Sequence, residues 1–426
     1  MRLLEDAARY AARHGRLRLL RIVVALGANI NAVDVDGETA LHHAIRFSNC
    51  NDEEDEEEVR ELVRVCGAAV SVVRASPPKS HVRLAIELGK VAALRALAAT
   101  LPAAFPQFVD NCGETMLFWA VESGQVGTAR YLLEQGCDVH AASKYAGDNV
   151  LGRAVAKAGL EVVALLVDGG YGADVRGPVA SGQLQPLHIA ALRGAADVAA
   201  LLIARGAAVD GTDARGATPL HMSVDVGVTS LLLQHGASID AADAVKQTAL
   251  YRAAAKGNLT MAQHLLRNGA TVDAPDAQGE TPFRAAVENG HLQLAAVLLA
   301  HGAAIDAQDH CGFSSVHECA YMGHMEALAF LLARGADVNL VSAVGKAPLD
   351  VAATCVRRNR RGEVARLLVE NGARPSPFLA SPSPPSSSLP VPLPTTPVLP
   401  QRSQRNFACF VSNLENTHED TDDEDD

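Results

Sequence analysis

The sequence predicts an all-α solenoid of about eleven stacked helix pairs, joined by short β-hairpin loops and followed by a C-terminal tail that lacks a core. Three observations predict it: a pattern that returns every 33 residues, a helix-start motif that opens each repeat, and a Leu-Leu motif followed by Gly-Ala that closes it. A single helix pair cannot bury its apolar side alone, so such units have to stack on their neighbours.

The helix-start motif carries the period. From Gln185 onward its successive copies lie 33, 30, 33, 33 and 33 residues apart, and two weaker copies begin at Asp6 and Ser80. The motif reads "TALHHA" at Thr39, "TMLFWA" at Thr115, "NVLGRA" at Asn149, "QPLHIA" at Gln185, "TPLHMS" at Thr218, "TALYRA" at Thr248, "TPFRAA" at Thr281, "SSVHEC" at Ser314 and "APLDVA" at Ala347.

One unit shows why this pattern folds into a helix pair. In the unit that starts at Asp276, Gly279 supplies the backbone freedom for a turn. Thr281 stands where a helix N-cap belongs, and Pro282 follows at the first helical position, where its missing N–H costs nothing. The second helix has apolar residues on one face, and Gly302 fits a left-handed cap after it.

The units define the domain organisation. We expect the array to span residues 1–374, with units starting near residues 1, 34, 75, 110, 144, 180, 213, 243, 276, 309 and 342. Residues 375–426 form a disordered tail, first rich in Pro and Ser and then acidic, because ten of the chain's twenty prolines fall within 375–400.

The period, the T-P-L-H-x-A motif and the Leu-Leu motif together resemble the ankyrin repeat family. The resemblance implies that His221 makes a hydrogen bond between repeats. It also implies that hairpin tips and first helices form a concave surface that holds protein partners.

The stretch "TPLHMSVDVG" raises a competing interpretation. Thr218, His221 and Asp225 lie at i, i+3 and i+7, one face of a helix, and match a nucleophile, a base and an orienting acid. The threonine and the histidine recur at the same positions in other units, so we interpret them as scaffold and expect no enzyme activity.

Four units depart from the pattern, and one of them, the unit of Ser80, lacks the Gly-Ala ending and has Pro102 instead, so we expect a weak joint or bend between residues 70 and 110. The acidic run 52–58 is expected to form a solvated loop that precedes the helix "VRELVRV" and favours its positive end, with an acidic finger for a basic partner as the alternative. The unit at Thr218 is three residues short, which we assign to its second helix. In the last unit, Arg357, Arg358, Arg360 and Arg361 suggest a solubilising surface turn or, alternatively, a nuclear import signal.

Charge and composition limit the function classes. The net charge is −12, but the runs 52–58 and 415–426 hold fifteen negative charges, so the remainder carries about +3 and lacks the basic footprint of a nucleic-acid binder. The cysteines occur singly and the histidines follow the repeat register, so we expect no metal and no cofactor. No apolar run is long enough to span a membrane. We expect a cytoplasmic monomer, with a nuclear location as the alternative.

Candidate binding residues follow from the repeat register and from the tail. The exposed positions near each signature threonine supply partner-binding candidates, which are Phe47, Glu122, Arg193, Arg215, Lys256, Glu280, Glu288, Asn289, Tyr321 and Met322. The tail supplies an apolar stripe with helical spacing before the acidic run, which is either a peptide that folds into a partner's groove or a chance cluster beside a solubilising block; its residues are Phe407, Phe410, Val411 and Leu414.

The predicted function is therefore a non-catalytic scaffold that binds a partner protein through the concave surface of the array. The alternative is a substrate-recruiting adaptor subunit of a larger enzyme complex, for example a ubiquitin ligase. Capture of a reproducible enzyme partner would favour the adaptor.

Overall fold

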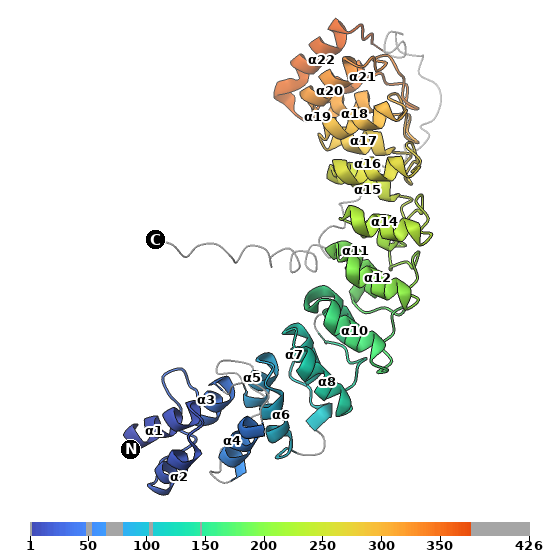
Figure 1. Cartoon of the computed structure of the whole chain (residues 1–426). Coiled ribbons are helices and arrows are strands. Elements are labelled where there is room, and N and C mark those ends of the chain that lie inside the picture. The colour runs from blue at the N-terminus through green and yellow to red at the C-terminus, as the bar shows by residue number, and fades with distance from the viewer. Residues whose placement is uncertain (1, 48–52, 65–79, 102–104, 145–146, 376–426) are drawn as a thin grey trace, which may run out of the picture. The chain divides into compact units, whose positions relative to one another are not determined.

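The computed structural model describes residues 2–47, 53–64, 80–101, 105–144 and 147–375. It divides into two compact units, Met1–His310 and Cys311–Asp426. In each unit most helices come in pairs, and a short loop joins the two helices of a pair (Figure 1). The predicted all-helical repeat architecture is confirmed in the described part of the chain.

The first unit holds the helices labelled α1 to α18. They are α1 (Arg2–Arg13), α2 (Leu17–Ala25), α3 (Ala40–Phe47), α4 (Glu53–Arg64), α5 (His81–Glu87), α6 (Val91–Ala98), α7 (Met116–Glu122), α8 (Val126–Glu134), α9 (Val150–Arg153), α10 (Leu160–Asp168), α11 (Pro186–Arg193), α12 (Ala196–Ala204), α13 (Pro219–Met222), α14 (Val226–Gln234), α15 (Ala249–Lys256), α16 (Leu259–Arg267), α17 (Pro282–Glu288) and α18 (Leu292–Ala300).

The described part of the second unit holds the helices labelled α19 to α22. They are α19 (Ser315–Met322), α20 (Met325–Leu332), α21 (Pro348–Ala352) and α22 (Arg361–Glu370).

Each first helix packs on its own partner and on the first helix of the next repeat. Helix α17 contacts both α15 and α18, and in the second unit α19 contacts both α20 and α21. The seam is apolar: Phe283 of α17 and Leu294 and Leu298 of α18 are buried. Truncating one of these buried leucines to alanine would cost about 2–5 kcal/mol of stability.

Local sequence sets the ends of these helices as predicted. The Thr281 hydroxyl caps α17 by accepting a hydrogen bond from the Arg284 N–H (3.3 Å), and Pro282 occupies the first turn. Gly279 and Gly302 have φ values of +84° and +91°, the left-handed region in which glycine carries no steric cost.

The hairpin loops are held by aspartate side chains. Asp276 Oδ1 accepts hydrogen bonds from the N–H groups of Gln278 (2.8 Å) and Glu280 (2.9 Å), and Asp243 makes the same pair of bonds in the preceding repeat. Within the described residues, extended backbone pairs only as isolated β-bridges, such as Val109 with Thr115. Backbone bonds within the same turn, from the Asp276 N–H to the Glu280 carbonyl (2.9 Å) and from the Gly279 N–H to the Asp276 carbonyl (3.1 Å), act together with these side-chain bonds.

The acidic run 52–58 departs from the expected loop, because α4 already begins at Glu53. Glutamate is a good helix former, and its negative charge is favoured in the first turns of a helix. Arg60 adds ion pairs with Glu56 and with Glu57 (3.0 Å), one turn earlier on the same helix. Most of the acidic residues therefore belong to α4 itself, whereas the sequence predicted that they form a loop before it.

The shortened repeat also differs from its prediction. The second helix α14 spans Val226–Gln234 and keeps nine residues, the length of α16 and α18. The loss falls on the first helix, because α13 ends at Met222 after four residues. Asp225 then starts the next helix as its N-cap and accepts a hydrogen bond from the Val228 N–H (3.0 Å). A capping aspartate at this position competes with continuation of the first helix.

Candidate interaction surface

The polar residues of "TPLH" form a joint between neighbouring repeats. The Thr218 N–H donates to His221 Nδ1 (3.1 Å), and the Thr218 hydroxyl lies 2.9 Å from the same nitrogen. The other ring nitrogen, Nε2, lies 2.8 Å from the carbonyl oxygen of Gln247 in the next repeat. A carbonyl can only accept and an N–H can only donate, so the bonds require the neutral Nε2–H tautomer.

This geometry excludes the catalytic interpretation of the stretch. Thr218 and His221 are buried, and both ring nitrogens are used by the joint. Asp225 lies beyond the end of α13, where it caps α14, so the three residues do not share one helix face. The assignment of Thr218 and His221 to the scaffold is confirmed.

The same histidine joint occurs in two other repeats. His188 accepts from the Gln185 N–H (3.2 Å) and reaches the Ala217 carbonyl (2.9 Å). In the second unit, His317 reaches the Lys346 carbonyl (3.0 Å). Burial lowers the pKa of His188 and of His221, because a charged imidazole would lose its hydration.

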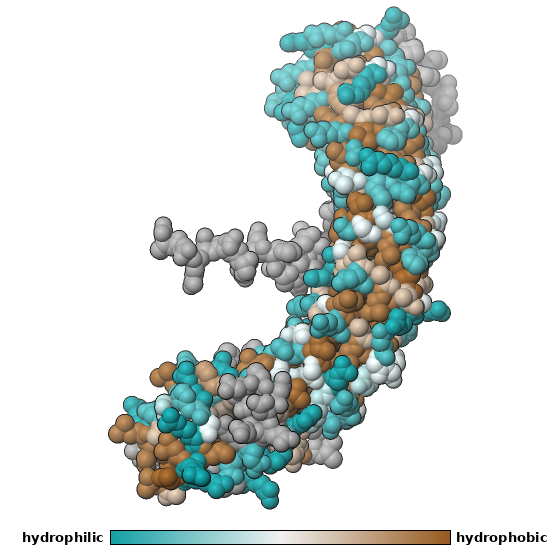
Figure 2. Space-filling model, viewed as in Figure 1, coloured by the Kyte–Doolittle hydropathy of each residue, from teal (hydrophilic) through white to brown (hydrophobic). Residues whose placement is uncertain are grey.

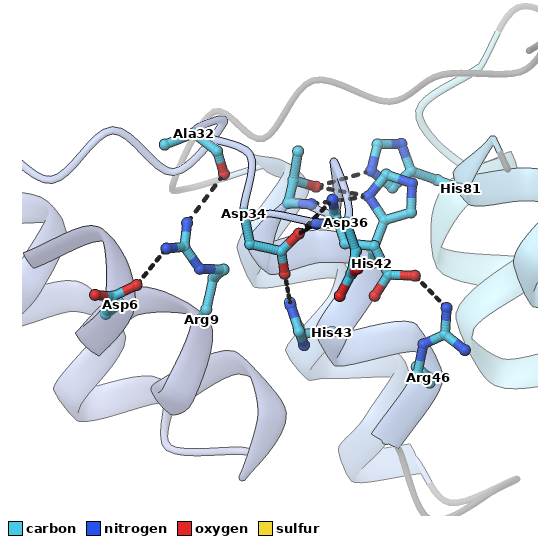
Figure 3. A network of polar contacts seen from close by, with 11 residues as sticks. Asp6, Arg9, Ala32, Asp34, Asp36, His42, His43, Arg46 and His81 are labelled. Carbon is cyan, nitrogen blue, oxygen red and sulfur yellow. Dashed lines mark hydrogen bonds and ion pairs between the residues drawn. The ribbon is translucent and has the colours of Figure 1, made fainter. Parts of the chain in front are cut away.

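The N-terminal repeats vary this joint by using a second histidine (Figure 3). The Thr39 hydroxyl lies between His42 Nδ1 (2.9 Å) and His81 Nε2 (3.0 Å), and the two rings are in contact at a tilt of 42° with centroids 3.9 Å apart. Nearby, His43 Nε2 lies 2.8 Å from Asp34 Oδ2. Burial would raise the pKa of Asp34, but its hydrogen bond with His43 and two backbone N–H bonds lower it below the ordinary value.

A different joint, built from charges, surrounds Arg153. Its guanidinium group contacts Asp148 (2.7 Å), Glu122 (3.1 Å) and Glu114 (3.2 Å), and only about a tenth of its side chain is exposed. Burial alone would lower the pKa of Arg153, but the hydrogen bond and charge of Asp148 and the two glutamates raise it. Lys157 adds a second cation to Glu122 (3.0 Å).

A third arrangement starts from a tyrosine and links side chains of three successive repeats. The Tyr251 hydroxyl donates to Glu280 (3.2 Å), Glu280 pairs with Arg284 (3.3 Å), and Arg284 pairs with Asp309 (2.8 Å). Burial raises the pKa of Tyr251 and of Glu280. Tyr251 and Arg284 occupy the register position that holds histidine elsewhere, so side chains of other chemistry make the joint there.

The predicted partner-binding residues fall into two groups. Glu122 and Glu280 are half-buried and take part in the ion pairs just described. The other eight are exposed or half-exposed, with Phe47 and Tyr321 each 39% exposed; these eight are Phe47, Arg193, Arg215, Lys256, Glu288, Asn289, Tyr321 and Met322.

The two units each carry part of this set. Arg193 is the last residue of α11 and Lys256 the last residue of α15, and each is followed by a left-handed glycine. Tyr321 and Met322 end α19 in the second unit. The tail candidates Phe407, Phe410, Val411 and Leu414 lie outside the described residues.

Some exposed apolar side chains were not singled out from the sequence. Figure 2 shows apolar residues at the surface of the first helix pair, where Leu3, Ile22 and Leu26 are exposed. In the last repeat, Val356 is 57% exposed beside the arginines of the lengthened loop. Counted from its helix-start motif to its closing glycine, this last unit is four residues longer than the unit of Thr281, and that excess in the sequence marks the loop.

A metal site or a membrane-spanning helix would suggest another function. In the part of the chain that the structure describes, no three His, Cys, Asp or Glu side chains come together in a way that would hold a metal ion. Among the same residues, no helix has the length and apolar character needed to cross a membrane.

Comparisons with known proteins follow the repeat pattern. A model described as ankyrin repeats (3 copies) matches residues 50–143, 151–243 and 225–309, one described as ankyrin repeats (many copies) matches 8–52, and an ankyrin repeat model matches 311–343. Among solved structures, the ankyrin repeat domain of Bcl-3, titled a unique member of the IkappaB protein family, is 29% identical; the match covers 52% of this chain and 99% of that chain, with a TM-score of 0.44. The family matches cover more than half of the sequence, and the chain belongs to the ankyrin repeat family.

Proposed function

We propose that the chain is a non-catalytic scaffold that binds a partner protein through side chains at the hairpin tips and at the C-terminal ends of the first helices. Ankyrin repeats are typically protein-interaction modules without catalytic activity, which supports the general class. The observation that carries the proposal is that polar side chains at buried and at exposed register positions have different surroundings. Polar side chains at buried register positions, such as His221, form the joints between repeats, whereas Arg193 and Lys256 stand at register positions that are exposed at the ends of first helices.

Charge gives the exposed positions of the first unit a chemical preference. Arg193, Arg215 and Lys256 are exposed cations that come from three successive repeats. Arg193 and Lys256 also lie at helix C-termini, where a positive charge is favourable, so their presence is compatible with stability as well as with binding. We propose that these cations meet acidic groups of the partner.

The experiment compares two charge-reversed variants of the full chain. Partners are first captured with the intact chain, and the affinity of each purified partner is then measured for R193E/K256E. The matched control is R130E/R267E, which reverses two exposed arginines on the second helices α8 and α16. We expect R193E/K256E to bind about tenfold more weakly and to lose much of the salt dependence, because charges at an interface rim act mainly through electrostatic complementarity. Equal affinity of the two variants would contradict the proposal.

The adaptor alternative is tested by the identity of the same partners. A substrate-recruiting subunit would recover an enzyme subunit together with its substrates, and that enzyme would modify the substrate faster when this chain is present. A scaffold without that role would recover partners but leave the rate unchanged.

A further inference from the structure

The last repeat carries an inserted loop that adds side chains to the end of α19. Two residues, Gly323 and His324, separate α19 from α20, whereas residues 353–360 separate α21 from α22. This longer loop includes the short 3₁₀ turn Arg358–Arg360.

Hydrogen bonds fix the inserted loop against α19. The Val356 N–H donates to the carbonyl of Tyr321 (2.8 Å), and Arg360 Nη1 donates to the carbonyl of Gly323 (3.2 Å). Arg361 Nε donates to the Cys355 carbonyl (2.9 Å) within the loop. Two of the four arginines are therefore bound to backbone carbonyls, and their side chains serve the loop itself.

The remaining side chains form a mixed surface, which we name the α19-end patch. It consists of Tyr321, Met322, Val356, Arg357 and Arg358. Tyr321 and Val356 are exposed, and so are the two arginines. Within the described residues, neither Arg357 nor Arg358 has an ion-pair partner. An exposed aromatic and a valine beside two exposed cations fit an apolar segment flanked by acidic residues.

The chain's own tail has that composition. Phe407, Phe410, Val411 and Leu414 form an apolar stripe with helical spacing, and eight acidic residues follow within 415–426. The order matches the patch, in which apolar side chains lie next to cations.

The attachment of the tail makes this encounter easy. A compact chain with as many residues as the described part of the second unit has a diameter of roughly 30 Å. That described part ends at Pro375. The Pro-rich segment 376–406 can span up to about 90 Å when extended. A tethered segment of this kind experiences an effective concentration on the order of a millimolar, so even a weak contact would be populated.

We propose that residues 407–426 bind the α19-end patch of the same molecule, with Phe407 and Phe410 against Tyr321, Met322 and Val356 and the acidic run against Arg357 and Arg358. The bound tail would cover Tyr321 and Met322, so a partner that uses these residues would have to displace it. The proposal itself does not depend on any partner, because the contact is made within one chain.

Hydrogen–deuterium exchange of the full chain tests this contact. Exchange of the backbone amides in 353–360 is followed by mass spectrometry for the natural chain, for F407A/F410A and for R357Q/R358Q. The matched control is L393A/L399A, which removes two apolar side chains from the Pro-rich segment outside the stripe. We expect F407A/F410A and R357Q/R358Q to raise exchange by about threefold or more, since release of a tethered segment populated at millimolar effective concentration exposes the loop. The control should leave exchange unchanged.

The remaining outcomes would overturn the proposal. Unchanged exchange in F407A/F410A would show that the tail does not cover the loop. Protection that disappears when the natural chain is diluted from about 20 µM to about 0.2 µM would assign the contact to the tail of a second copy, because only an intermolecular contact depends on concentration. An equal rise in the L393A/L399A control would show that the effect is not specific to the stripe.

Discussion

The joint at His221 is neutral, whereas the joint at Arg153, one register position later in another repeat, is built from charges. His221 bonds to one carbonyl of the next repeat and needs no counter-charge. Arg153 balances three carboxylates, and each of those carboxylates depends on it in turn. The comparison teaches that neighbouring repeats can be joined from adjacent register positions and by different chemistry.

The two chemistries differ in how they fail. When a neutral hydrogen bond is lost, one buried polar group is left without its partner. When a buried arginine is lost, several negative charges are left without compensation, which costs far more. The following changes test this difference, from the largest expected effect to the smallest.

Replacing Arg153 by alanine should have the largest effect. Asp148 is buried and Glu114 and Glu122 are half-buried, so the variant leaves their charges uncompensated. Removal of one partner from a buried ion pair typically costs about 3–5 kcal/mol. Urea unfolding, together with amide exchange over 147–168, measures the loss. Lys157→Ala is the matched control, because Lys157 is 40% exposed and pairs with the same Glu122; it should cost less than about 1 kcal/mol. Equal losses would contradict the account of the charged joint.

Replacing His221 by alanine should have an intermediate effect. The Gln247 carbonyl and the Thr218 N–H both lose their partner, which should cost about 1–3 kcal/mol in the free energy of unfolding. The measurement is again urea unfolding. His235→Ala removes an exposed histidine after α14 and should leave stability nearly unchanged. If both alanine variants unfolded at the same urea concentration, the histidine joint would contribute no stability.

Acid should weaken the neutral joints. The pKa of His188 and of His221 is lowered in the folded chain relative to the ordinary value of 6.5. Below about pH 6.5 the unfolded chain therefore binds protons that the folded joints exclude, and the free energy of unfolding falls as the pH decreases. Above that pH the contribution is fully present. The measurement is urea unfolding between about pH 5 and about pH 8, a range around the ordinary histidine pKa. The free energy of unfolding should fall with decreasing pH in the natural chain and fall less steeply in H188N/H221N. An identical slope in both proteins would contradict the prediction.

Asp225 should give the smallest effect. It caps α14 through a hydrogen bond from the Val228 N–H, and loss of an N-cap costs about 1 kcal/mol. Asp225→Ala should show that loss in urea unfolding, whereas Asp225→Ser should stay close to the natural chain because serine also caps helices. A serine variant as unstable as the alanine variant would assign Asp225 another role.

The sequence predicted the repeats well because period and helix-start chemistry repeat many times. Thr281, Pro282 and the glycines have the roles that their residue types indicate. The shortening at Thr218 was placed on the wrong helix, since counting residues between motifs does not reveal that Asp225 starts a new helix. The joint at Arg153 was not foreseen, because its carboxylates lie up to 39 residues away in sequence and come together only when repeats stack.

The candidate surface was predictable in part, because the repeat register indicates which positions of each unit are exposed. Register placed Arg193 and Lys256 at exposed helix ends, and the structure has them there. Register did not show that Glu122 and Glu280 bond to neighbouring repeats, because Arg153 stands at the variable position of the motif and Tyr251 replaces its usual histidine.

The central claim is that the polar residues of the repeat motif are architectural, with His221 as a neutral bridge between repeats. Long-range ¹H–¹⁵N spectroscopy of the imidazole ring tests it directly, with the His221 signal assigned from its absence in the H221Q variant. The account predicts an Nε2–H tautomer at neutral pH and a pKa below the ordinary histidine value. An Nδ1–H tautomer, or a ring that titrates like an exposed histidine, would contradict it.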